Sequence, residues 1–288
     1  MPMTNLPAGY DREADDLGNI VELGHVNVTI PDQGPATLFY VAGLGLTRDP
    51  FMSVSVTNMW VNAGRSQFHL PEGPPQSLGG IVELVLPDLA ALRARLERVR
   101  PRLASTRFDW RDRDGAVETT CPWGNVMRCH APDEARFGPI SLGIASVAFP
   151  APAGSAAGIA RFYRDLLGAR AELPVAGTAR ITVGADQTLL FTEAEGAKPP
   201  FTGAHVQVSI ADFSGPHRRL LERGLVTEES DEHQYRFADI VDPEDGRVLL
   251  QLEHEVRSLR HPMFGRALIN RNPAQTAGPY RAGRDHFP

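Results

Sequence analysis

The chain has 288 residues, of which 42% are hydrophobic and 22% are charged, and its formal net charge is −6. This length accommodates one large or two ordinary domains, and the composition is typical of a globular protein. The negative charge argues against nucleic acid or an anionic membrane as the main partner, and no apolar run approaches the roughly 18 residues that a membrane span needs.

An N-terminal extension, residues 1–19, comes first. It is acidic near its end and lacks the basic and apolar regions of a signal peptide, so we expect a cytoplasmic protein. Its expected partner is a small molecule. The sheet edges that this class of fold exposes also make a homodimer plausible.

Four similar segments then follow in chain order. Each opens with a strand of alternating apolar residues, passes through Pro, Asp, Gly or Ser, and continues as an amphipathic helix. Three short strands with Gly- or Pro-containing turns come after each helix. Each segment is therefore predicted to be βαβββ, and since one such unit cannot cover both faces of its sheet, the units should pair. The openings are HVNVTIPD from His25, IVELVLPD from Ile81, IASVAFPA from Ile144 and HVQVSIAD from His205.

Several stretches resemble the vicinal oxygen chelate superfamily, which includes glyoxalases, extradiol dioxygenases and bleomycin resistance proteins. They are HVNVTIPD, FYVAGLGL, MWVNAGRSQFHLPEG, CPWGNVMR and VDPEDGRVLL, and the resemblance covers about residues 20–256. It implies an α+β fold of four βαβββ modules, paired into two open mixed β-barrels with the helices outside. The implied domains are 20–132 and 139–256. The tail, 257–288, is expected either to drape over a barrel or a neighbouring subunit, or to be loose.

The resemblance also implies a metal site. Metal-binding members carry their ligands on the first and last strands of the modules, facing into the barrel. His25 and His69 occupy such positions in the first module, and His205 occupies one in the fourth. A one-residue bulge after the long DPEDG turn would bring in Glu253. These ligand types suit Fe, Mn, Ni or Zn. For the histidines, direct contact with an organic ligand and a structural hydrogen-bonding role remain the alternatives.

The other ligand positions depart from this pattern. Arg128 replaces the closing-strand ligand of the second module, and its planar fork suits a carboxylate or phosphate on a substrate. The alternative for Arg128 is a salt bridge to Glu83 across the barrel. Both residues are predicted to take part in catalysis if they face a cavity. Apolar residues fill the remaining ligand positions, namely Ile81, Ile144, Leu190 and Leu250.

The segment 228–242 contains a strand with one aromatic and one polar face. If the aromatic face lines the second cavity, Tyr235 can act as an acid or base and can stack on a ligand together with His233. Packing under a helix is the alternative. Gln207, on the strand of His205, is also predicted to contact the ligand.

Two functions follow from these observations. The first is an enzyme acting on a small oxygenated substrate, assisted by a divalent metal, by lyase, isomerase or dioxygenase-type chemistry. Ring-opening oxygenation is the weakest branch, because no predicted barrel supplies two histidines and a carboxylate in standard register. The second is a metal-free binding or resistance protein. Signatures for NAD or ATP are missing, and Lys198, the only lysine, stands in a Pro-rich loop, which disfavours pyridoxal phosphate.

Overall fold

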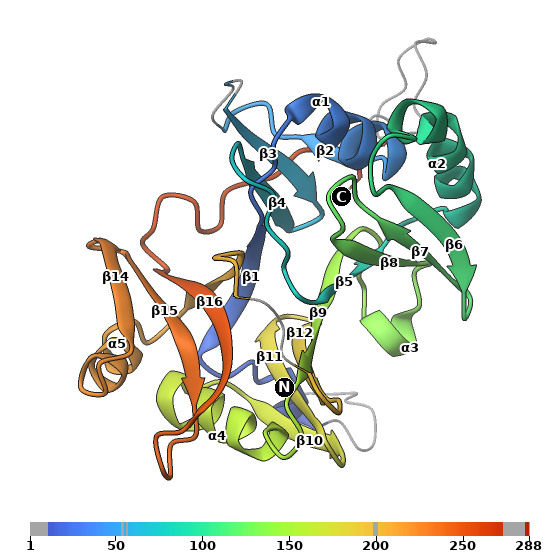
Figure 1. Cartoon of the computed structure of the whole chain (residues 1–288). Coiled ribbons are helices and arrows are strands. Elements are labelled where there is room, and N and C mark those ends of the chain that lie inside the picture. The colour runs from blue at the N-terminus through green and yellow to red at the C-terminus, as the bar shows by residue number, and fades with distance from the viewer. Residues whose placement is uncertain (1–10, 53–54, 56, 198–200, 273–285, 288) are drawn as a thin grey trace, which may run out of the picture.

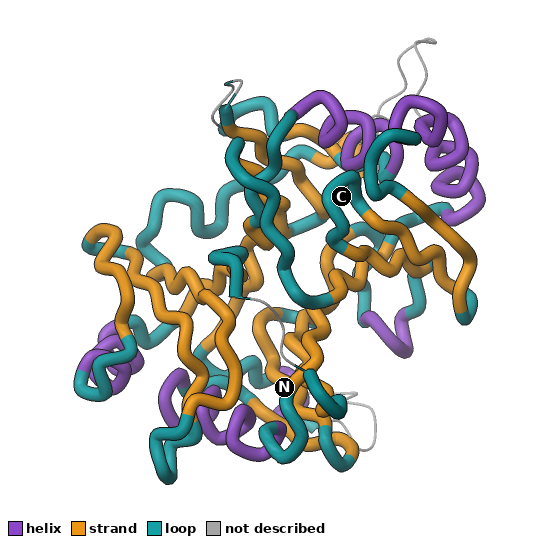
Figure 2. The backbone as a smooth tube through the Cα atoms, in the orientation of Figure 1, coloured by secondary structure: helices purple, strands orange, loops and turns teal. Residues whose placement is uncertain are grey.

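The computed structural model describes most of the chain (Figures 1 and 2), namely residues 11–52, 55, 57–197, 201–272 and 286–287. Three predicted features lie outside these residues, namely the start of the N-terminal extension, Lys198 and most of the tail after residue 272. None of the described helices has the length and apolar character needed to cross a membrane.

The four predicted βαβββ modules are all present. The first comprises β1 (Ile20–Asn27), α1 (Gln33–Ala36) with a π-helical continuation (Thr37–Gly43), β2 (Thr47–Arg48), β3 (Asn58–Ala63) and β4 (Ser66–Pro71). The second comprises β5 (Ile81–Val85), α2 (Leu89–Leu103), β6 (Asp109–Arg113), β7 (Ala116–Thr120) and β8 (Val126–His130).

The second half of the chain repeats this order. After the short helix α3 (Glu134–Phe137), the third module comprises β9 (Gly143–Ala151), α4 (Ala156–Leu167), β10 (Ala171–Val175), β11 (Thr178–Gly184) and β12 (Gln187–Glu193). The fourth comprises β13 (His205–Ile210), α5 (Ser214–Leu221), β14 (Val226–Asp231), β15 (Gln234–Val241) and β16 (Val248–Ser258). Two further short strands, β17 (Asn270–Arg271) and β18 (His286–Phe287), pair with each other.

Local sequence explains where the main helices begin and end. Helix α2 starts after Asp88, whose carboxylate accepts a hydrogen bond from the backbone N–H of Ala91 at 2.9 Å. Helix α4 ends at Gly168, which has a φ of 70° that a residue without a Cβ adopts readily. Buried apolar residues recur along one face of each of these helices, which attaches the helix to its sheet.

The strands form two open, eight-stranded mixed sheets, as the predicted fold class requires. Their orders are β14-β15-β16-β13-β1-β4-β3-β2 and β10-β11-β12-β9-β5-β8-β7-β6. The first module therefore shares a sheet with the fourth, and the second shares a sheet with the third. The expected pairing of consecutive modules is wrong, and each predicted domain contributes strands to both sheets.

The reason lies at the inner edge of each module. The first strand of every module is its inner edge, so any two first strands could pair. Here β1 pairs antiparallel with β13, and β5 pairs antiparallel with β9. Apolar periodicity identifies these strands but does not determine which of them meet.

The helices associate differently from the strands. The helical segment of the first module packs against α2, and α4 packs against α5. Figure 1 shows α1 and α2 together at the top of the molecule, with α4 and α5 in its lower part. The buried apolar residues of all four modules join into one large core. The two sheets and the helix pairs thus interlock the halves of the chain.

Candidate metal centre

The pairing of β1 with β13 creates a polar surface at the centre of the first sheet. In this sheet His25 lies beside Gln67 and Gln207, and Gln207 lies beside Glu255. Two residues further along β1, Asn27 lies beside His69 and His205. Residues that are paired across strands, or are two apart along one strand, face the same side of a sheet. These side chains therefore converge on one face.

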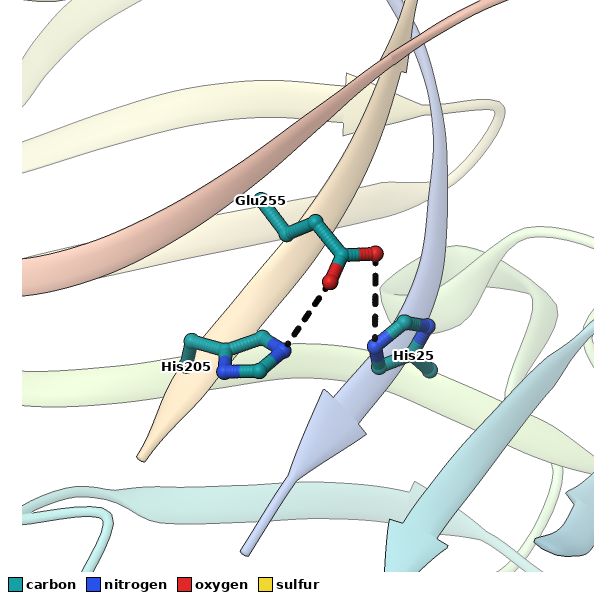
Figure 3. A group of neighbouring side chains, drawn as sticks. All are labelled: His25, His205 and Glu255. Atoms are coloured by element: carbon teal, nitrogen blue, oxygen red, sulfur yellow. Dashed lines mark ion pairs between the residues drawn. The ribbon is translucent and has the colours of Figure 1, made fainter. Parts of the chain in front are cut away.

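Three of the converging side chains form a compact group (Figure 3). One ligand atom from each of His25, His205 and Glu255 lies within 4.8 Å of the others. The Glu255 carboxylate is 3.9 Å from Nε2 of His25 and 3.5 Å from Nε2 of His205. His69 stands next to this group, with its ring centroid 5.5 Å from that of His25.

The histidine nitrogens in this group lack hydrogen-bond partners within the described structure. This holds for Nε2 of His25, Nε2 of His69 and both ring nitrogens of His205, all of which are buried. Burying a polar atom without a partner costs free energy, so buried unpaired groups usually mark a bound ion, a water or a ligand. A metal cation would satisfy several of these atoms at once.

The protonation states of His25, His69 and Glu255 suit metal binding. Burial lowers the pKa of His25 well below its usual value, and burial together with the neighbouring His205 lowers the pKa of His69 to about 3. Burial alone would raise the pKa of Glu255, but the nearby His205 and the positive charge of Arg257 outweigh it, and its pKa lies well below the usual range. Neutral imidazoles and an ionised carboxylate are the forms that bind metals.

Two arginines also contact Glu255. Arg236 is 2.8 Å from one carboxylate oxygen, and Arg257 is 2.7 Å from the other. Arg257 is further held by Gln234, which accepts a hydrogen bond from its Nε at 2.9 Å. These contacts fix the orientation of the carboxylate, and they also balance its charge.

Comparisons with known proteins place this geometry in a wider context. No family model and no curated protein matches the sequence. Among solved structures, glyoxalase I from Zea mays superposes with a TM-score of 0.55 at 12% identity, over 86% of this chain and 95% of that one. A "putative dioxygenase" from Bacillus subtilis subsp. subtilis str. 168 superposes with a TM-score of 0.54 at 14% identity, over 84% of this chain and 86% of that one. The chain has the vicinal oxygen chelate fold.

Within the vicinal oxygen chelate fold, the predicted histidines come together. His25, His69 and His205 lie in one cluster, although the sequence had assigned His205 to a different barrel. The group contains the carboxylate of Glu255, which the sequence analysis missed, rather than that of Glu253. The Glu253 carboxylate is 2.8 Å from Arg236 and 3.8 Å from Nδ1 of His205. Alternation along β16 could have suggested Glu255, because it faces the same side as Glu253 one step further on.

The predicted roles of the strand at 234–241 need correction. Tyr235 lies on the opposite face from Arg236, buried against Phe213 and His217 of the α5 region. The aromatic face of β15 packs under a helix, and the polar face of β15, which carries Arg236, turns to the cluster. His233 is half-buried in the turn before β15, where it contacts Ser258. Neither residue lines the cavity that was expected for them.

The remaining predicted contacts divide between the two sheets. Gln207 lines a small pocket beside His25, and its contact with a ligand stays a prediction. Glu83 and Arg128 lie in the second sheet and form a salt bridge of 3.2 Å, the alternative that the sequence left open. Arg128 forms a second salt bridge of 3.0 Å, to the Glu118 carboxylate, and His130 forms a hydrogen bond with Glu83. In the described residues, the second sheet offers no compact group of three potential metal ligands.

Proposed function

We propose that the chain is an enzyme that uses a divalent metal, bound by His25, His205 and Glu255, to act on a small oxygenated molecule. The observation that carries this proposal is the convergence of two buried histidines and a buried carboxylate from three adjacent strands. A metal there would polarise an oxygen of a chelated substrate, and the protein would leave coordination positions open for it.

His69 distinguishes two reaction classes. Two histidines and one carboxylate with open positions are typical of non-haem Fe(II) oxygenases, and this set is available here across the first and fourth modules. With His69 as a fourth ligand, an octahedral metal keeps only two positions, enough for a chelating substrate in lyase or isomerase chemistry. Oxygenation ranked lowest from the sequence because no predicted barrel supplied two histidines and a carboxylate in standard register.

The test is metal content. We expect protein that has been purified without chelator and loaded with Mn(II), Fe(II), Ni(II) or Zn(II) to hold about one ion per chain, and we expect His25→Ala and Glu255→Gln to lose it. Glu253→Gln is the matched control, since it removes the neighbouring carboxylate and should keep the ion. Circular dichroism verifies that each variant folds. Retention of metal by folded Glu255→Gln would contradict the proposal.

A metal-free binding protein is the second candidate. One observation favours it: Arg236 and Arg257 already balance the charge of Glu255. In this case all four metals fail to bind, while a small ligand raises the melting temperature. Turnover of such a ligand would argue against this candidate.

A further inference from the structure

A cavity of about 440 Å³ has walls that come from both sheets. Glu22 of β1 and Arg65 of the β3–β4 turn belong to the first sheet, Ile144 and Gln187 belong to the second, and the segment 265–268 closes one side. The volume falls in the range of pockets that hold small organic molecules.

Four residues line both this cavity and the small separate pocket that contains His25, namely Glu22, Arg65, Arg266 and Leu268. These four residues, which we call the junction, therefore lie between the large cavity and the pocket of His25.

The wall of the cavity is largely apolar where the two modules of the second sheet are joined. Ile140, Leu142 and Ile144 line it there, and Leu268 lines it on the side of the C-terminal segment. Such a wall suits the hydrocarbon part of a ligand, because burying apolar area is favourable.

One cation of the junction, Arg65, is available to bind an anion. Arg65 is exposed and has no hydrogen-bond or ion-pair partner within the described parts of the chain. Arg266 is held 2.7 Å from Asp49, and Glu22 accepts a hydrogen bond from Ser209 at 2.9 Å. The other acid of the cavity, Asp186, is exposed in the β11–β12 turn. An incoming carboxylate would therefore find a free guanidinium, which can bind it through two hydrogen bonds.

We propose that this cavity binds an amphipathic organic carboxylate, with its apolar part against Leu142 and Ile144 and its carboxylate at Arg65. This deepens the proposed function by naming the substrate class. Because Arg65 also lines the small pocket that contains His25, the carboxylate end of the ligand would lie on the side of that pocket. The anion-binding part of the inference does not require a metal, so it can be tested separately.

The experiment uses the full chain and three aromatic carboxylates: mandelate, benzoate and phthalate. Their binding to metal-free protein is measured by ligand-observed NMR, with mandelamide as the uncharged counterpart of mandelate. We expect Arg65→Gln to weaken mandelate binding about fivefold or more. Arg98→Gln, which removes an exposed arginine of α2, is the matched control and should change nothing. Ser141→Trp, which narrows the cavity, should also weaken binding.

Addition of Mn(II) separates this inference from the proposed function. Bound mandelate should relax faster in the Mn(II)-loaded protein, and His25→Ala should abolish this effect while keeping the binding that depends on Arg65. Absence of Mn(II) binding with intact carboxylate binding would overturn the metal enzyme alone. Equal binding by wild type and Arg65→Gln, equal binding of mandelamide and mandelate, or no binding of any of the three acids would overturn the carboxylate site.

Discussion

The imidazole of His69 lies flat against the indole of Trp60, with ring centroids 3.8 Å and planes 12° apart. This stacking orients the ring next to the compact group of His25, His205 and Glu255. We expect His69→Ala to keep the metal but to lower its affinity about tenfold, because three ligands remain. Competition with a chelator measures the affinity, and Trp60→Phe serves as a control that preserves an aromatic support. Unchanged affinity would show that His69 is not a ligand, which would favour the oxygenase class.

A second residue-scale prediction concerns Glu118 in the second sheet. Burial acts to raise its pKa, but hydrogen bonds from Arg111, Arg128 and Arg113 outweigh this and lower the pKa to about 2. Because the folded pKa lies below the ordinary value of 4.5, the ionised carboxylate stabilises the fold above about pH 4.5. This contribution is lost as the pH falls toward 2.

We therefore expect Glu118→Gln to lower the free energy of unfolding by about 1–2 kcal/mol at pH 7. The difference from wild type should shrink between pH 5 and about pH 2, as the wild-type carboxylate takes up a proton. Urea unfolding at several pH values measures it, with the exposed Glu134→Gln as control. A difference that stayed constant with pH would contradict the assignment of the low pKa to this carboxylate.

Within strand β1, a bulge shapes the site. The register of β1 against β13 shifts between Leu23 and His25, so Gly24 occupies the irregular position. A Cβ atom at Gly24 would lie 1.9 Å from Oε1 of Gln207. The glycine thus leaves room for the Gln207 side chain beside His25.

From this contact we expect Gly24→Ala to displace the Gln207 amide and to lower the free energy of unfolding by about 1–2 kcal/mol. The double variant Gly24→Ala/Gln207→Ala removes the clash and should recover a large part of this loss. Urea unfolding of the two single variants and the double variant gives the coupling. Additive effects in the double variant would mean that the two side chains do not interfere.

The strands and the helices follow from local patterns in the sequence, whereas the resemblance to a known superfamily implied two of the three clustered ligands, His25 and His205. His25 was expected to open its strand, but β1 begins at Ile20. Glu255 was missed because the resemblance indicated one position on β16, Glu253, and Glu255 lies on the same face two residues later. Tyr235 was misplaced because alternation along β15 separates two faces without telling which one meets a helix. Such choices depend on contacts between elements that are distant in the sequence.

At the scale of the whole molecule, the sheets and the helices connect the chain in two different ways. The sheets join the first module to the fourth and the second to the third. The helix pairs join the first module to the second and the third to the fourth. Every module is therefore bound to two others, and the candidate metal centre exists only where the first and fourth modules meet.

This interlocking predicts the result of cutting the chain between its halves. Ala131 and Pro132 are exposed, so a protease recognition sequence can be inserted between them. We expect the two fragments to stay together after cleavage, because β1 remains paired with β13 and β5 with β9. Each half on its own would expose the inner edges of its sheets and a large apolar surface, and should aggregate or remain unfolded. Gel filtration and metal content of the cut protein test this, with the uncut insertion variant as control. Separation into two independently folded fragments would instead support a division of the chain into consecutive domains.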